Sequence, residues 1–300
     1  MRVVTLLPSA TEIVYALGVE PVGVSHECDH PPAAREQPSV NRSRVDPTAS
    51  SGEINEQVAS AESSGGVYAV ERETLAGLDP DLIVTQGVCD VCAVDEVVVA
   101  DAVEALGLDT EILTLDIHSL DGLFDSIHRI GAAVGRDDRA ADLVADLRSR
   151  VDAVESTASR ATDRPRVAVL DWTDPVMVAG HWVPEMIALA GGDYGLEDAG
   201  AHSRPREWVE LREYDPEVLV VSPCGFDLPQ IRENLADVTD RPGWDELSAV
   251  ANDRVTLIDG HHYVNRSGPR LVETLEYLGW AIHPDLFDRP PADAVEALST

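Results

Sequence analysis

Residues 121–161 have the sequence DGLFDSIHRIGAAVGRDDRAADLVADLRSRVDAVESTASRA, and the expected architecture follows from this segment. Its apolar residues recur at steps of three and four, a spacing that is typical of amphipathic helices. The spacing breaks at Gly135, so we expect a first helix to end near Gly135 and a second to begin at Asp137 or Asp138. At 1.5 Å per residue, the second helix would be about 35 Å long.

An alternation of strand-like and helix-like segments precedes this stretch, and a second one follows it. We therefore expect an α/β protein with two Rossmann-like lobes, joined by a single long helix and separated by a cleft. The alternative is that the helix packs on the sheet of a single domain. The expected parts are an N-terminal lobe over 1–119, connecting helices over 120–161, a C-terminal lobe over 162–287 and a frayed tail over 288–300.

The chain is strongly acidic and contains no lysine. Its 300 residues carry 55 acidic and 22 basic side chains, for a formal net charge of -33. The absence of lysine excludes Schiff-base chemistry and a P-loop. The charge makes nucleic acid an unsuitable partner, because phosphates would be repelled. We interpret the dispersed acids as a halophilic surface that stays solvated at high salt; an acidic binding face is the alternative.

The sequence shows no targeting or membrane-spanning segment. Met1 and Arg2 run directly into strand-like residues, which leaves no room for a signal peptide. No apolar run reaches the roughly 18 residues that would cross a membrane. As written, the chain is expected to be cytoplasmic and monomeric, and it would be extracytoplasmic if it were a mature or truncated form.

All four cysteines follow the end of a predicted strand. They are Cys28, the pair Cys89 and Cys92 with Cys-x-x-Cys spacing, and Cys224. In open α/β sheets the loops after strand ends line the ligand crevice. Four thiolates are a ligand set for tetrahedral zinc or an iron–sulfur cluster, so the four cysteines are candidate metal ligands. A disulfide between Cys89 and Cys92, or independent small apolar thiols, would also fit the sequence.

Histidines, aromatic residues and an arginine occupy similar positions after predicted strands. Each histidine could be a ligand-binding residue or only a hydrogen-bonding loop residue, and each arginine could bind an anion or form a surface ion pair. Ser9 with Glu12 further predicts a capping box at the first helix. The candidate ligand-binding residues are Ser9, His26, Glu27, Gln86, His118, His181, Trp182, Phe226, His262, Tyr263 and Arg266.

Several motifs together resemble those of a known family. They are LLPSATE (6–12), CDHPP (28–32), LDPDLIV (78–84), AGG (190–192) and NRSGPR (265–270). In this order they are similar to the cobalamin-binding proteins of ABC importers, within the wider family of cobalamin, haem and ferric-siderophore binders. The resemblance covers nearly the whole chain to about residue 287. It implies two α/β lobes, one long connecting helix and a ligand held between the lobes.

The resemblance also assigns roles to individual positions. Glu73 matches a carboxylate that docks on arginines of the membrane permease, whereas the matching carboxylate of the second lobe falls near Asn265. Two aromatic positions that pack on the corrin correspond to Glu27 and Gln86. The expected function is thus a non-enzymatic binding protein for cobalamin, a related corrinoid or another small-molecule metal chelate, with a possible ABC permease partner. The alternative is a metalloenzyme with zinc or an iron–sulfur cluster on the four cysteines.

Overall fold

The computed structural model describes residues 1–63, 66–87, 94 and 96–298. The chain forms two compact units. Unit 1 comprises Met1–Ala49, Glu53–Ile117 and Asp121–Asp146, and unit 2 comprises Ser50–Gly52, His118–Leu120 and Leu147–Thr300. The boundary between Asp146 and Leu147 falls inside one continuous helix, so this helix belongs to both units. The expected architecture of two α/β lobes with a shared long helix is therefore present.

Unit 1 is built on a parallel sheet with strand order β2-β1-β5-β6. Its central strands are short and apolar, and every residue of β1 and β5 is buried. Helix α1 packs on β1 and α4 packs on β5. The elements are β1 (Val3–Thr5), α1 (Pro8–Ala16), β2 (Gly23–Val24), α3 (Arg72–Leu78), β5 (Leu82–Gln86), α4 (Glu96–Leu106) and β6 (Glu111–Leu115).

Unit 1 also contains elements that the sequence did not predict. Strands β3 (Asn41–Ser43) and β4 (Tyr68–Val70) form a separate antiparallel pair. A 3₁₀ helix, η1 (Pro32–Glu36), precedes this pair. Helix α2 (Ser51–Glu62) lies between its strands in sequence and agrees with the helix that the sequence predicts near residues 54–62; its first two residues belong to unit 2. The three-residue strands are too short for a visible alternation of apolar and polar residues, so they could not be predicted from the sequence.

The predicted helix pair is confirmed. Helix α5 (Leu120–Ala133) ends just before Gly135, whose φ of 65° is the left-handed conformation that stops helices, and α6 (Asp137–Ala158) begins at the expected residue. With 22 residues, α6 is about 33 Å long. Leu123, Ile127 and Ile130 of α5 are fully buried. A Cβ on Gly131 would contact the Cβ of Ala140 at 2.5 Å, so glycine permits the close approach of α5 to α6.

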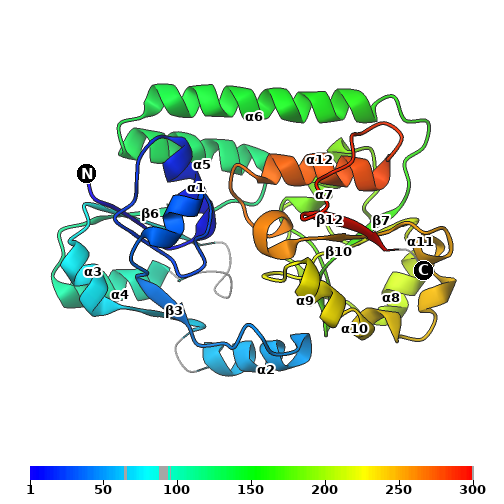
Figure 1. Ribbon diagram of the computed structural model, residues 1–300, viewed down its shortest axis with the longest axis horizontal. Coiled ribbons are helices and arrows are strands. Elements are labelled where there is room, and N and C mark those ends of the chain that lie inside the picture. Colours follow the sequence, from blue (N-terminus) through cyan, green and yellow to red (C-terminus); the bar gives the residue numbers. More distant parts are fainter. Residues whose placement is uncertain (64–65, 88–93, 95, 299–300) are drawn as a thin grey trace. The chain divides into compact units, whose positions relative to one another are not determined.

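Unit 2 contains a larger mixed sheet with strand order β12-β11-β10-β7-β8-β9. Strands β7, β10 and β11 are parallel, whereas β8, β9 and β12 pair antiparallel with their neighbours. Within this unit, Figure 1 shows α12 above the strands and α9 and α10 below them. The strands are β7 (Val167–Thr173), β8 (Val176–Val178), β9 (Arg204–Pro205), β10 (Val218–Val221), β11 (Val255–Ile258) and β12 (Val295–Leu298).

The helices of unit 2 follow the strands in the βα order that the sequence predicted. Helix α12 packs on α7 and on β10, while α9 packs on β11. The helices are α7 (Val183–Leu189), α8 (Trp208–Tyr214), α9 (Leu228–Glu233), α10 (Ala236–Thr239), α11 (Ser248–Ala251) and α12 (Leu271–Ile282), with η2 (Trp244–Glu246) and the π-helical turn η3 (Gly260–Val264) between them.

Two local predictions are wrong. The segment expected to be a frayed tail forms β12, which pairs with β11 and buries Val295 to 5% exposure. The prolines that suggested disorder lie before this strand, where they do not interrupt its hydrogen bonds. The capping box of Ser9 and Glu12 is also absent. Helix α1 begins at Pro8, so its N-cap is Leu7, and no side chain caps it.

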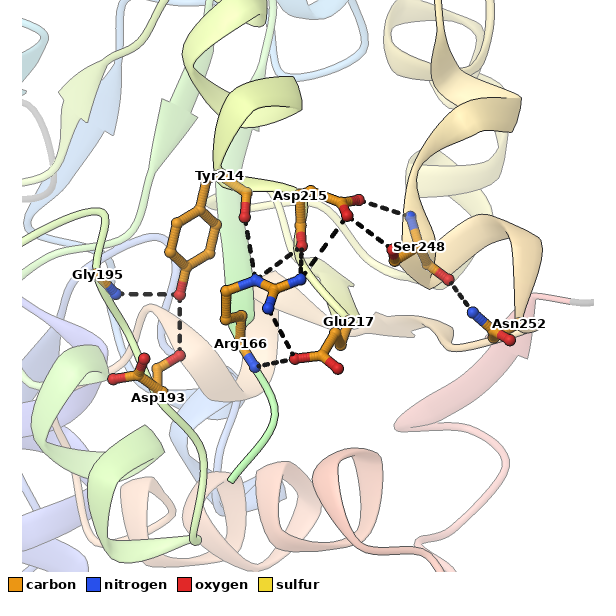
Figure 2. A network of polar contacts seen from close by, with 8 residues as sticks. All are labelled: Arg166, Asp193, Gly195, Tyr214, Asp215, Glu217, Ser248 and Asn252. Atoms are coloured by element: carbon orange, nitrogen blue, oxygen red, sulfur yellow. Dashed lines mark hydrogen bonds and ion pairs between the residues drawn. The ribbon is translucent and has the colours of Figure 1, made fainter. Parts of the chain in front are cut away.

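A polar network holds the start of β7 in unit 2 (Figure 2). The Arg166 guanidinium donates to the carbonyls of Tyr214 and Asp215, and it forms an ion pair with Glu217 at 3.3 Å. The Asp215 carboxylate in turn accepts hydrogen bonds from the backbone N–H and the hydroxyl of Ser248, both at 2.8 Å. The hydrogen bonds from Ser248 lower the pKa of Asp215. This network connects β7 to the end of α8 and the start of α11.

Candidate functional site

In unit 2, the loops after parallel strands β10 and β11 meet at one edge of the sheet. The backbone N–H groups of Gly260 and His261 donate to the Phe226 carbonyl at 2.9 and 3.0 Å. The N–H of Cys224 donates to the carbonyl of Asp171 in β7 at 3.0 Å. These hydrogen bonds bring the predicted site residues after β10 and β11 into one loop cluster. This is the edge at which open α/β sheets bind ligands.

Two histidines of this cluster have ordered partners. The N–H of His262 donates to Oδ1 of Asp259 at 2.7 Å, and its Nδ1 lies 2.8 Å from Oδ2 of the same carboxylate. Asp259 is 4% exposed, so the pair is fixed in position. Nε2 of His261 accepts from the Arg266 guanidinium at 3.0 Å, and Arg266 is itself buried. A carboxylate on one imidazole nitrogen is the arrangement that orients the opposite nitrogen toward a metal.

The predicted aromatic residues divide into two groups. Tyr263 is partly buried, and its ring lies 5.1 Å from that of Tyr277. Trp182 and Phe226 are buried, with 7% and 3% exposure. Trp182 donates to the carbonyl of Val264 at 2.9 Å, which connects the start of α7 to η3. Trp182 and Phe226 therefore act mainly through packing, because little of either side chain is available to a ligand.

A second group of histidines lies at the end of β8. Nδ1 of His118 is 3.2 Å from Nδ1 of His181, and the ring of His202 is edge-on to both, with centroid distances of 5.6 and 5.1 Å. Burial and the neighbouring imidazoles of His118 and His202 lower the pKa of His181 to about 4. The sequence predicted His118 and His181 but missed His202, which lies in the long connection before β9 and not directly after a strand.

In unit 1, the predicted residues lie after β1 and β2 and at the last position of β5. Ser9 and Gln86 are buried, with 4% and 6% exposure. Nδ1 of His26 lies 3.0 Å from the Asn41 side-chain oxygen, and its Nε2 lies 3.1 Å from the Glu27 carboxylate. Burial alone would lower the pKa of His26, but the hydrogen bonds with Glu27 and Asn41 outweigh it and raise this pKa.

Of the four cysteines that were predicted to bind a metal, the structure describes only Cys28 and Cys224. Cys89 and Cys92 lie outside the described residues. Cys28 is 4% exposed and packs in an apolar cluster with Val24 and Ala34, with its Sγ 2.9 Å from Oγ1 of Thr11. Cys224 is exposed in unit 2. The environment of Cys28 is that of a structural thiol. A common thiolate centre stays a prediction, and the described part of the chain adds no support for a metalloenzyme.

The two positions assigned to permease docking differ in their surroundings. Glu73 is exposed in the first turn of α3. Asn265 ends η3, and its side-chain amide donates to the Ser222 carbonyl at 3.1 Å. An amide can hold this loop in place, but it cannot replace a carboxylate in an ion pair with arginine.

The chain thus consists of two α/β units, and histidines gather at strand ends of the sheet in unit 2. The chain belongs to the periplasmic binding protein family, which matches residues 3–261. A relative of 26% identity is an uncharacterized ABC transporter substrate-binding lipoprotein of Bacillus subtilis. The similarity spans 95% of this chain and 81% of the relative.

Solved structures with the same fold include haem and vitamin B12 binders. A periplasmic haem-binding protein of Roseiflexus is 24% identical with a TM-score of 0.71, over 94% of this chain and 98% of that one. A periplasmic haem-binding protein of Pseudomonas aeruginosa is 21% identical with a TM-score of 0.75, over 100% and 98%. The vitamin B12-binding protein of Vibrio cholerae is 22% identical with a TM-score of 0.67, over 94% and 96%.

Proposed function

We propose that this protein is the substrate-binding component of an ABC importer and that its substrate is a planar metal chelate of the haem or corrinoid type. Family membership and the lipoprotein relative support the transport role. The haem-binding and vitamin B12-binding proteins of the same fold support the ligand class. The same relatives favour the extracytoplasmic alternative over the cytoplasmic one. No helix in the described residues is long and apolar enough to cross a membrane.

The Asp259–His262 pair is the observation that carries the ligand class. An imidazole whose Nδ1 is held by a buried carboxylate is suited to ligate iron or cobalt through Nε2, because the carboxylate fixes the ring and increases its basicity. We infer that His262 supplies an axial ligand to the metal of the chelate. Tyr263 and the Arg266–His261 pair lie next to it in sequence and would contact the periphery of the ligand.

The test is titration of the purified protein with haemin and with hydroxocobalamin, followed by visible absorbance. We expect saturable binding with a shifted spectrum for at least one of the two chelates. His262→Ala should abolish the shift, and Asp259→Asn should weaken binding by about 10- to 100-fold, the usual effect of removing a partner of a metal ligand. His128→Ala is the matched control, because His128 is exposed on α5 and far from this loop cluster in sequence. If neither haemin nor hydroxocobalamin binds at saturating concentration, the proposal is refuted.

A further inference from the structure

The histidines at the end of β8 are held together by backbone contacts. The N–H of His181 donates to the Ala201 carbonyl at 2.5 Å, and the N–H of Gly200 donates to the His181 carbonyl at 2.8 Å. A Cβ on Gly180 would overlap the Ala201 carbonyl oxygen, so only glycine allows this approach. Because residues 180–181 and 200–201 are bound so closely, His202 is placed beside His181.

His118 reaches the same place from another part of unit 2. It precedes α5, and the N–H of Leu120 at the start of that helix donates to the Glu185 carboxylate of α7 at 3.0 Å. His181 lies just before α7 and has a φ of 51°, in the left-handed region. Three imidazoles from distant points of the sequence therefore meet at one place.

The spacing of the two closest nitrogens suits a metal ion. Two imidazole nitrogens bound at 2.0–2.1 Å to a tetrahedral Zn²⁺ lie about 3.3 Å apart. The Nδ1 atoms of His118 and His181 are 3.2 Å apart, and both rings are partly buried. An N–H···N hydrogen bond between the rings would have a similar length, and metal titration separates the two arrangements.

The third imidazole must turn to complete such a site. His202 is exposed, and its ring stands at 84° to that of His181. Within the described residues, the three rings do not offer three nitrogens that all lie within 4.8 Å of one another. Rotation of an exposed side chain is inexpensive, and the centroid distance of 5.1 Å leaves His202 within reach.

We propose that His118, His181 and His202 bind a borderline divalent transition metal ion such as Zn²⁺ or Ni²⁺. His118 and His181 provide two ligands through Nδ1, His202 provides a third, and water completes the coordination. Imidazole donors favour zinc, nickel and copper over calcium and magnesium. A net charge of -33 raises the local concentration of any divalent cation around the protein. The site is separate from His262 in sequence, and the proposal does not depend on transport of a chelate.

Isothermal titration of chelator-treated protein with zinc chloride and nickel chloride tests the proposal. We expect one equivalent of either ion to bind. His181→Asn is the informative variant, because asparagine tolerates a positive φ and keeps the fold, and it should weaken binding by about 100-fold or more. His118→Ala should have a similar effect and His202→Ala a smaller one, while His128→Ala should have none.

Thermal melting of each variant checks that unit 2 remains folded. Binding that is unchanged in folded His181→Asn, or no uptake of either ion by the native protein, would overturn the proposal. The haemin and hydroxocobalamin titrations are independent of this outcome. A protein that binds zinc but no chelate would refute the proposed function alone, and one that binds a chelate but no free ion would refute the metal site alone.

Discussion

A buried carboxyl group in unit 2 should make the stability of this unit depend on pH. Asp171 lies in β7 where the register with β8 shifts, and it is 9% exposed. Its Oδ1 has no hydrogen-bond partner among the described residues. Burial raises the pKa of Asp171 to about 6 from an ordinary 3.8, against the opposing effect of a hydrogen bond with Ser203. Ionisation of this group therefore destabilises the folded unit.

The magnitude follows from the difference in pKa. A folded pKa about 2 units above the unfolded value corresponds to about 3 kcal/mol, at 1.36 kcal/mol per unit. Because the folded state binds the proton more tightly, the stabilisation is fully present below pH 3.8 and is lost as pH rises through about 6. Asp171→Asn resembles the protonated form, so we expect it to stabilise unit 2 by about 3 kcal/mol at pH 8 relative to the native protein, and by little below pH 4.

Urea unfolding at constant high salt, followed by tryptophan fluorescence, measures this difference. All five tryptophans belong to unit 2, so the signal reports the unfolding of that unit alone. Asp288→Asn, at an exposed position, removes one charge from the surface and is the matched control. A difference between Asp171→Asn and the native protein that stays constant from pH 4 to pH 8 would refute this account of the buried carboxyl group.

Three further predictions concern other parts of the chain. Asp215→Asn should destabilise unit 2 by about 1 kcal/mol at neutral pH, because it weakens the hydrogen bonds from Ser248. Since the pKa of Asp215 is lowered in the folded state, this cost should begin to decrease only below the ordinary pKa of 3.8 and should be lost as pH falls through the lower folded pKa; urea unfolding at pH 7 and at a series of acidic pH values checks it. Glu73→Lys should reduce ABC-dependent uptake of the chelate without changing its binding constant, whereas Glu104→Lys on α4 should leave uptake unchanged. Transfer from about 1 M to 0.1 M salt should lower the melting temperature, because the screening length grows from about 3 to 10 Å; an unchanged melting temperature would contradict the halophilic interpretation.

The fold was largely predictable because its central elements have strong and regular signals. The three- and four-residue steps around Ile127 and Leu147 gave the ends of α5 and α6, and continuous apolar runs gave β5 and β10. The sequence did not predict the pairing of short strands that are distant in sequence. The residues of β12 resemble a disordered tail, because only their pairing with β11 makes them a strand, and β9 is only two residues long.

The candidate site was predictable in part. Placement after strand ends singled out His118, His181 and His262, and the structure places them in two loop clusters of unit 2; their role in ligand binding stays a prediction. The position of Cys28 in a loop could not show that its side chain packs in an apolar cluster, because a loop position does not determine the direction of a side chain. His202 was missed because its place beside His181 depends on the close backbone approach at Gly180, and that contact leaves no periodic signal in the sequence.

The pairing of β12 with β11 bears on how the chain can be shortened or tagged. β12 is the outermost strand of its sheet, so a clone that stops before residue 295 would turn β11 into an edge with unsatisfied backbone groups. Such an edge recruits strands from other copies and leads to aggregation. At the opposite border, Pro205 of β9 lacks an N–H and discourages the same association. Soluble yield, and not ligand affinity, would be the first property to suffer from a trimmed C-terminus.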